Sequence, residues 1–191
     1  MATNQRFTVK YRRKRAGRTN YRKRLHALAG GVPRLVVRKS LHHMQLQIIE
    51  YQPTGDRVLV SATTKELSKQ GYKGATSNLP AAYLCGVLLA KKAKAKKVIH
   101  AVADIGFTTP VKGAVVFAAV AGARAGGLDV PADEKALPDK KRLHGEHVAA
   151  YAMLIKKDDA LYKKMFAAYL RHGLAPETLP KHVQEVEAKL K

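Results

Sequence analysis

The segment "TVKYRRKRAGRTNYRKRL", residues 8–25, carries many arginines and lysines, two tyrosines and no acidic residue. Arginine can donate two parallel hydrogen bonds to a phosphate group, and its planar side chain can stack on a base. Tyrosine rings such as those of Tyr11 and Tyr21 can stack on unpaired bases. Together these residue types favour folded RNA over plain duplex DNA as the partner of this segment.

A second candidate segment for RNA contacts is the loop "SKQGYKGATSN", residues 68–78. Glycines on both sides of Tyr72 and Lys73 predict a loop that exposes an aromatic ring beside a cation. Flexible backbone of this kind can approach a sugar-phosphate chain closely. The alternative is a simple turn between a strand and a helix, and the sequence leaves both interpretations open.

Three acidic residues raise the alternative of metal-dependent phosphoryl chemistry. Asp104 follows a predicted strand, where many α/β enzymes carry a catalytic acid. Such chemistry needs several carboxylates at one site, and only Glu50 and Asp56 lie near other predicted strand ends. We therefore favour a turn or capping role for Asp104 and predict no catalytic residue.

The histidines and the single cysteine do not indicate a metal site. His144 and His147 in "HGEH" are three residues apart across a glycine, whereas the histidines of a zincin are four apart on a helix. His42 and His43 are adjacent in a predicted strand and would point to opposite faces. Cys85 is the only cysteine, which excludes an intramolecular disulfide and is typical of a reducing cytosol. We predict neither a metal nor a cofactor.

The charge of the whole chain agrees with a polyanionic partner. The 191 residues include 36 Lys and Arg against 14 Asp and Glu, a formal net charge of +22, and the first acidic residue is Glu50. So much uncompensated charge favours nucleic acid or an anionic membrane surface as a partner; the alternative, a solvated run of charge, is weaker because no acidic residues are interspersed. The basic segment lacks a strongly apolar helix face, and the apolar runs are too short to span a bilayer, so we expect no membrane partner.

The pattern of apolar residues predicts one α/β core. The segments 34–40, 44–51 and 57–63 are rich in β-branched or alternating residues and predict three consecutive antiparallel strands. A helix within 78–97, a buried strand within 97–106 and a helix within 113–127 follow. The order β-β-β-α-β-α indicates one mixed sheet covered by helices.

The same reading divides the chain into three parts. Residues 1–30 form a basic arm, helical around 18–28, and residues 31–128 form the α/β body. Residues 129–191 contain a long proline-punctuated connection and short amphipathic helices, expected at 145–156, 158–172 and 180–190. In the second of these helices, Leu161, Met165 and Tyr169 or Leu170 form an apolar stripe that we expect to pack internally.

Five separated segments together resemble a known family. They are "RRKRAGRTNYRKRL", "PRLVVRKS", "GYKGATSNLPAAYLCGVLLAKKA", "ADIGFTTPVKGAVVFAAVAGARAGGLDVP" and "LPDKKRLHGEHV". In this order and spacing, from about residue 6 to residue 150, the chain resembles the large-subunit ribosomal protein L-eighteen, called L-five in eukaryotes. Because the bacterial form stops soon after the second helix of the body and the eukaryotic form is considerably longer, the resemblance implies an archaeal type.

The resemblance implies a structural protein of the cytoplasmic ribosome, without catalysis or cofactor. Its members bind 5S ribosomal RNA and help to seat it in the central protuberance, beside 23S-type RNA, a neighbouring 5S-binding protein and other proteins of that region. Carried over by motif, the RNA contacts would be Arg12, Arg13, Arg15, Arg18, Tyr21, Arg22, Arg24, Arg34, Arg38, Gly71, Tyr72, Lys73, Gly74 and Asn78.

The main alternative is a metal-dependent nuclease that acts on RNA and uses a similar sheet. That alternative predicts magnesium-dependent RNA cleavage that is abolished when Asp104 is changed. The structural RNA-binding function is the one that the sequence favours.

Overall fold

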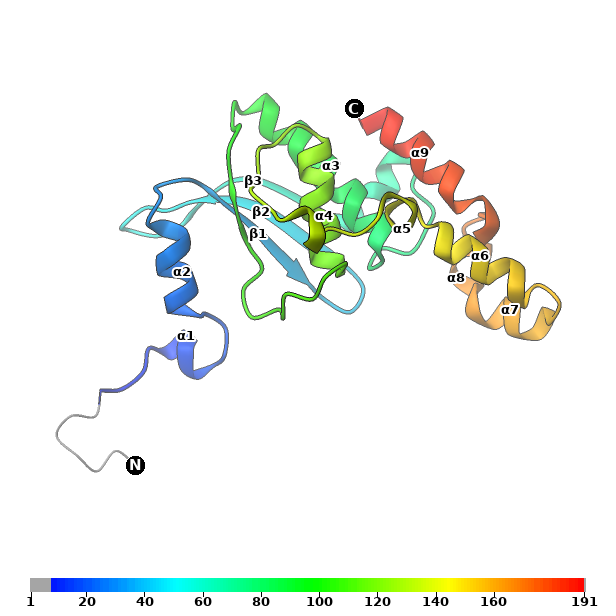
Figure 1. Ribbon diagram of the computed structural model, residues 1–191, viewed down its shortest axis with the longest axis horizontal. Coiled ribbons are helices and arrows are strands. Elements are labelled where there is room, and N and C mark those ends of the chain that lie inside the picture. The colour runs from blue at the N-terminus through cyan, green and yellow to red at the C-terminus, as the bar shows by residue number, and fades with distance from the viewer. Residues whose placement is uncertain (1–7, 191) are drawn as a thin grey trace.

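The computed structural model describes residues 8–190, and its centre is a four-stranded mixed sheet (Figure 1). The strands are β1 (Arg34–Lys39), β2 (Met44–Glu50), β3 (Arg57–Thr63) and β4 (Val102–Asp104). Their order across the sheet is β3-β2-β1-β4, with the first three antiparallel and β4 parallel to β1. The predicted α/β class and the antiparallel run of three strands are confirmed.

Alternation of side chains gives the sheet two different faces. Met44, Leu46 and Ile48 of β2 are fully buried, whereas Gln45 between them is exposed. Successive residues of a strand point to opposite faces, so one face of the sheet is apolar and the other carries polar groups.

One detail of the predicted pattern in β3 is wrong. The alternation typical of a strand predicts Val58 and Val60 on the same face, but Val60 is buried and Val58 is 48% exposed. The pairing with β2 shifts between Ile48 and Ile49, so that Ile48 lies opposite Val60 and Ile49 opposite Val58. Such a bulge changes the direction of the side chains on one strand, which strict alternation cannot anticipate.

Two helices cover the apolar face of the sheet: α3 (Leu79–Ala95) and α4 (Val115–Ala125). Both were predicted. They pack closely because Gly86 and Gly122 lie at the contact: a Cβ atom on either one would collide with backbone of the facing helix, at Ala119 and Tyr83 respectively. The two glycines therefore allow a close approach that no larger residue permits.

The arm lies at one end of the molecule, at the blue end of the chain in Figure 1. It contains α1 (Arg12–Arg15) and α2 (Tyr21–Leu28), and the side chain of Asn20 caps α2 by accepting a hydrogen bond from the Lys23 amide at 3.2 Å. Neither helix contains a buried residue. The predicted helix around residues 18–28 is confirmed as α2, while α1 was not predicted.

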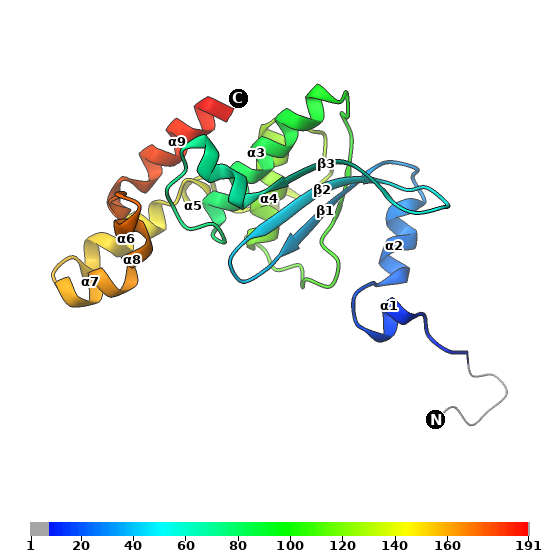
Figure 2. The ribbon, with the colours of Figure 1, turned by 180° about the vertical axis from the view of Figure 1, so that it is seen from behind.

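The C-terminal helices lie at the opposite end of the molecule, and Figure 2 shows the same separation from behind. Their bounds, with those of the short 3-10 segments, are η1 (Thr64–Gln70), η2 (Glu134–Ala136), α5 (Lys140–His144), α6 (Glu146–Ile155), α7 (Asp159–Met165), α8 (Ala167–Arg171), η3 (Pro176–Thr178) and α9 (Leu179–Leu190). The helix predicted at 158–172 is interrupted at Phe166, and α5 was not predicted.

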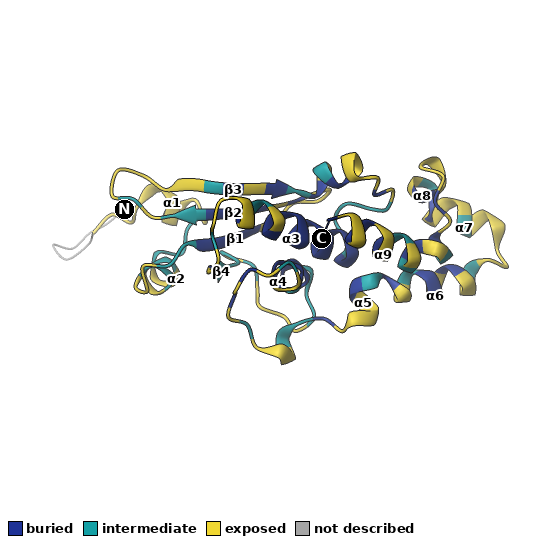
Figure 3. Cartoon of the chain, turned by 90° about the horizontal axis from the view of Figure 1, so that it is seen from above, coloured by how far each residue is buried: buried dark blue, intermediate teal, exposed yellow. Residues whose placement is uncertain are grey.

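Helix α7 is exposed along most of its length, which differs from the expected apolar stripe (Figure 3). Tyr169 is buried as expected, but Leu161, Met165 and Leu170 are exposed. The break at Phe166 separates α7 from α8, so the residues no longer share one continuous face. Within residues 8–190, no helix is long and apolar enough to cross a membrane.

Candidate nucleic-acid interface

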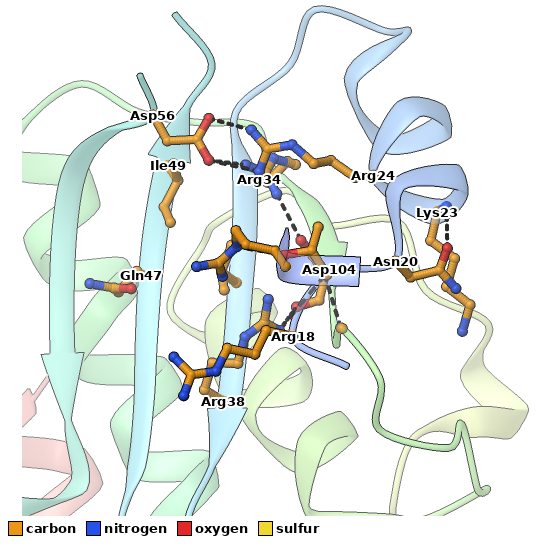
Figure 4. A pocket seen from close by; sticks show the side chains of 14 residues that line it. Arg18, Asn20, Lys23, Arg24, Arg34, Arg38, Gln47, Ile49, Asp56 and Asp104 are labelled. Atoms are coloured by element: carbon orange, nitrogen blue, oxygen red, sulfur yellow. Dashed lines mark hydrogen bonds and ion pairs between the residues drawn. The ribbon is translucent and has the colours of Figure 1, made fainter. Parts of the chain in front are cut away.

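The polar face of the sheet and the arm enclose a hollow of about 210 Å³ (Figure 4). It is lined by residues of α2 and of the segment before it, by residues of β1 and β2, by Asp56 at the end of the β2–β3 turn, and by Asp104 at the end of β4. The residues of the predicted set that line it are Arg13, Arg18, Arg24, Arg34 and Arg38. The structure therefore brings together five arginines from two separate stretches of the sequence.

Arg34 is the innermost of these arginines, with only 3% of its side chain exposed. Its two terminal nitrogens donate hydrogen bonds to Asp104 and to Asp56, each at 2.8 Å. A buried charge is tolerated only when it is paired in this way. Arg34 therefore connects β1, β4 and the β2–β3 turn, and its side chain is enclosed by protein.

Arg24 attaches α2 to the sheet through the same carboxylate. Its terminal nitrogens donate to both oxygens of Asp56, at 2.8 and 2.7 Å. This bidentate pair, with a further contribution from Arg34, holds the pKa of Asp56 below its ordinary value. Asp56 therefore stays ionised at neutral pH and fixes the orientation of the arm on the body.

Asp104 has the turn role that we favoured from the sequence. One of its oxygens accepts a hydrogen bond from the Gly106 amide at 2.9 Å, and the other accepts from Arg34. Asp56 and Asp104, which the metal-dependent alternative would need at one site, do lie close together, but both bind the guanidinium of Arg34. Among residues 8–190, no group of three or more His, Cys, Asp or Glu side chains is arranged to hold a metal ion.

Arg38 differs from Arg34 in being exposed toward the hollow. One of its terminal nitrogens donates to the carbonyl oxygens of Val37 and Asp104, at 3.1 and 3.3 Å. Its carboxylate contact, with Asp104, is longer at 3.8 Å. The rest of its hydrogen-bonding capacity faces solvent and is available to a phosphate group.

The remaining arginines of the arm are exposed. Within the described part of the chain, none of the following has an ion-pair partner: Arg12, Arg13, Arg15, Arg18 and Arg22. Tyr21 is half-buried against Tyr11, with the ring centroids 5.0 Å apart. The arm thus presents unneutralised cations and two aromatic rings on one short stretch.

The glycine-flanked loop does not expose its aromatic ring, contrary to our expectation. Tyr72 is only 4% exposed and stacks on His182 of α9, with the ring centroids 5.7 Å apart. The Lys73 amide donates to Nε2 of the same histidine at 3.1 Å. Because α9 covers the loop, the ring of Tyr72 is unavailable for base stacking, and burial raises its pKa.

Other residues of this loop have structural contacts of their own. Asn78 caps α3 by accepting from the Ala81 amide at 3.0 Å, and its side-chain nitrogen donates to the Tyr169 hydroxyl at 3.1 Å. Gly74 leaves room for the Tyr72 hydroxyl, with which a Cβ atom would collide. Gly71 is left-handed at φ 87° and ends the η1 turn, and the Lys73 side chain is exposed.

The predicted residues therefore form two groups. The arm and the polar face of the sheet share one hollow, while the 71–78 loop lies toward α9, away from the arm in Figures 1 and 2. Sequence reasoning considered Asp56 and Asp104 only as acids for metal chemistry or turns and missed that they bind arginines, and it missed Phe107, an exposed ring beside the arm. An apolar aromatic inside a Gly-, Thr- and Pro-rich loop was the available signal for Phe107.

Comparison with known proteins decides the family. Residues 5–100 match the family model described as "Ribosomal large subunit proteins 60S L5, and 50S L18". The chain is also 50% identical over 190 residues to "Large ribosomal subunit protein uL18" of Methanococcus maripaludis, covering 100% of this chain and 98% of the relative. The chain belongs to this ribosomal protein family. It is a structural protein of the large ribosomal subunit in the cytoplasm, and not an enzyme.

Family membership settles two further expectations. The archaeal type implied by the resemblance is confirmed, because the relative comes from an archaeon and is matched over 98% of its length. The nuclease alternative is wrong, since the large-subunit protein family is structural and the carboxylates it invoked are bound to Arg34. Ribosomal RNA is accordingly the class of partner for the protein as a whole.

Proposed function

We propose that the protein binds 5S ribosomal RNA and helps to anchor it in the central protuberance of the large subunit. Its surroundings there would be 23S-type RNA, a neighbouring 5S-binding protein and other proteins of that region. The observation that carries this proposal is the set of unpaired arginines on the arm, next to a hollow lined by five arginines. In a ribosomal protein, such a surface fits the backbone of a folded RNA.

Within this function, the three predicted parts of the chain have separate tasks. The arm, residues 1–30, supplies most of the phosphate contacts and orders further when RNA neutralises it. The body, residues 31–128, holds the arm through Asp56, which binds Arg24 of the arm and is itself held by Arg34, and the body adds Arg38. The extension, residues 129–191, reaches partners other than the 5S RNA surface that the arm contacts.

The residues predicted to contact RNA divide into direct and supporting roles. The exposed arginines and Tyr21 of the arm, with Arg38 and Lys73, contact RNA directly. Arg24 and Arg34 act by fixing the arm on the sheet. Gly71, Tyr72, Gly74 and Asn78 act by holding the loop against α9, so that Lys73 and the loop backbone are presented in one conformation.

A competition titration near physiological salt tests the proposal. Labelled 5S RNA is bound to the full chain and challenged with excess transfer RNA. Retention of 5S RNA is the expected result, and equal displacement by transfer RNA would overturn the assignment. Because any chain this basic attracts RNA, salt dependence alone does not show specificity for 5S RNA. The slope of log affinity against log salt, about 0.7 per contact in the single-strand limit, reports only the number of phosphate contacts.

A pair of charge-matched variants sharpens the same test. Replacing Arg15, Arg18 and Arg22 of the arm with glutamine is compared with replacing Lys157, Lys164 and Arg171 of the extension. Both variants lose three exposed cations. The first is expected to lose 5S affinity and specificity, whereas the second retains specificity and loses only general attraction. Equal losses would show that the arm is not a specific surface.

A further inference from the structure

A second hollow, of about 550 Å³, lies between the arm and the loop that follows β4. The arm contributes Lys10, Lys14, Arg15, Tyr21 and Arg22, and the loop contributes Phe107. None of these except Arg15, Tyr21 and Arg22 belongs to the set predicted from the sequence. The volume lies within the roughly 300–1,000 Å³ typical of sites for small ligands.

The charge of this hollow favours an anionic ligand. Lys10, Lys14, Arg15 and Arg22 line it, no carboxylate lines it, and no ion pair among residues 8–190 neutralises these four cations. The two acidic residues that line the first hollow, Asp56 and Asp104, are bound to arginines there. A ligand with phosphate charge matches these four side chains.

The ring of Phe107 gives the hollow a second property. It is 54% exposed, although its loop is fixed by hydrogen bonds from the Thr108 amide to the Ile105 carbonyl at 3.2 Å and from the Gly106 amide to Asp104 at 2.9 Å. A phenylalanine has no polar atom to interact with water, so a partner with a flat apolar face gains by covering it. Tyr21, supported by Tyr11, is the other ring at the hollow.

We propose that this hollow binds one unpaired nucleotide of the ribosomal RNA. The base stacks on Phe107 or Tyr21, and the adjoining phosphates are held by the four cations. An acidic protein segment would satisfy the charge but would leave the rings without a flat partner, so RNA is the occupant that fits both properties. This proposal rests on the proposed function and names a subsite within it.

The test compares three variants of the full chain: Phe107→Ala, Phe107→Tyr and Val111→Ala. Val111 is an exposed apolar residue of the same loop that lines neither hollow, and it provides the matched control. Base stacking predicts that Phe107→Ala weakens 5S RNA binding by about tenfold, while the other two variants bind like the original chain. Thermal unfolding of each variant confirms that the body is intact.

Chemical probing of the bound RNA provides a second readout. Loss of the ring is expected to increase the reactivity of one unpaired nucleotide in the complex with Phe107→Ala, and not in the complex with Val111→Ala. Unchanged affinity and an unchanged reactivity pattern would overturn the proposal. A loss of binding to hexaglutamate with no change in RNA affinity would also overturn it, because the hollow would then be a site for an acidic protein segment.

Failure of the subsite and failure of the proposed function are distinguishable. If the original chain retains 5S RNA against transfer RNA and Phe107→Ala does so equally well, only the subsite is wrong. If transfer RNA displaces 5S RNA equally from the original chain, the proposed function is wrong, whatever the variant does.

Discussion

The arm and the C-terminal extension are attached to the same body by different forces. The arm contains no buried residue in α1 or α2 and is joined to the sheet by the Arg24–Asp56 pair. Helix α9 instead buries Leu179, Val183, Val186 and Leu190 against the core. Partly exposed ion pairs contribute about 0–1 kcal/mol, whereas each fully buried aliphatic side chain contributes about 1.5–3 kcal/mol.

The comparison shows that the two ends of one small protein can be held to its body with different strengths, weakly at the arm and strongly at α9. The ion pair between Arg24 and Asp56 positions the arm but contributes little free energy, so RNA can compete for the arginines. Apolar packing makes α9 part of the body, and the Tyr83 hydroxyl adds a buried hydrogen bond to Glu187 at 2.8 Å. Burial and the neighbouring carboxylate raise the pKa of Tyr83, so this hydroxyl remains a donor.

The largest effect is expected from removal of residues 1–24, which carry ten Lys and Arg and no acidic residue. Loss of so many phosphate contacts should weaken 5S RNA binding by about a thousandfold, or roughly 4 kcal/mol. Because α1 contributes nothing to the core and α2 has no buried residue, the body should remain folded. Affinity is measured by titration and folding by circular dichroism; unchanged affinity would remove the arm from the mechanism.

The opposite end is tested by Leu179→Ala. Leu179 is fully buried at the start of α9, beside Gly145 and Pro80. Removal of a buried leucine side chain should lower the free energy of unfolding by about 2–5 kcal/mol, as measured by urea titration. RNA affinity should not change at temperatures where the variant is folded. A stability loss below about 1 kcal/mol would contradict the view that α9 belongs to the core.

A smaller effect is expected from Asp56→Asn, which breaks the attachment of the arm. Because the change also removes one of the two counter-charges of the buried Arg34, the loss in stability should be about 1–3 kcal/mol, and trypsin should cleave at Arg24 faster. Because the folded pKa of Asp56 is lowered, its contribution is present above the ordinary Asp pKa and is lost as the pH falls through the folded pKa.

The control is Asp129→Asn, which removes the same charge from an exposed pair with His100. Equal cleavage rates in the two variants would mean that Asp56 does not hold the arm.

The smallest effect concerns His182 and the 71–78 loop. Desolvation lowers the pKa of His182, opposed by Glu185 and reinforced by Lys73 and Lys189. The neutral ring accepts the Lys73 amide hydrogen, so protonation removes that bond. The protection factor of the Lys73 amide should therefore be highest above the ordinary His pKa and decrease as the pH falls through the folded pKa. Equal protection at pH 7 and pH 5 would contradict this linkage.

Most of the fold could be predicted because its signals are local. Alternation in β2 and the Asn78 cap with Pro80 in the first turn of α3 both lie within a few residues of the elements they specify. The helix predicted at 158–172 shows the limit: its apolar spacing is regular, but Phe166 turns inward and divides it. Tertiary packing, which short-range periodicity does not contain, decides such breaks.

The candidate site was predictable only in part, for the same reason. The cations of the arm are obvious from composition, since exposure is the default for unpaired arginine. Burial of Tyr72 depends on His182, 109 residues beyond Lys73, and nothing near the loop indicates that cover. Likewise, the pairing of Arg34 with Asp104 spans 70 residues and depends on where β4 joins the sheet.

The two carboxylates that neutralise Arg34 become available at different times during synthesis. Asp56 lies 22 residues after Arg34, within the antiparallel strands, whereas Asp104 lies 70 residues after it. Strand β4 pairs parallel to β1, which requires the intervening crossover through α3. A nascent chain paused before residue 104 therefore holds Arg34 with one of its two counter-charges and leaves one edge of β1 open. Completion of the sheet and full neutralisation of its central arginine are thus a single late event in biogenesis.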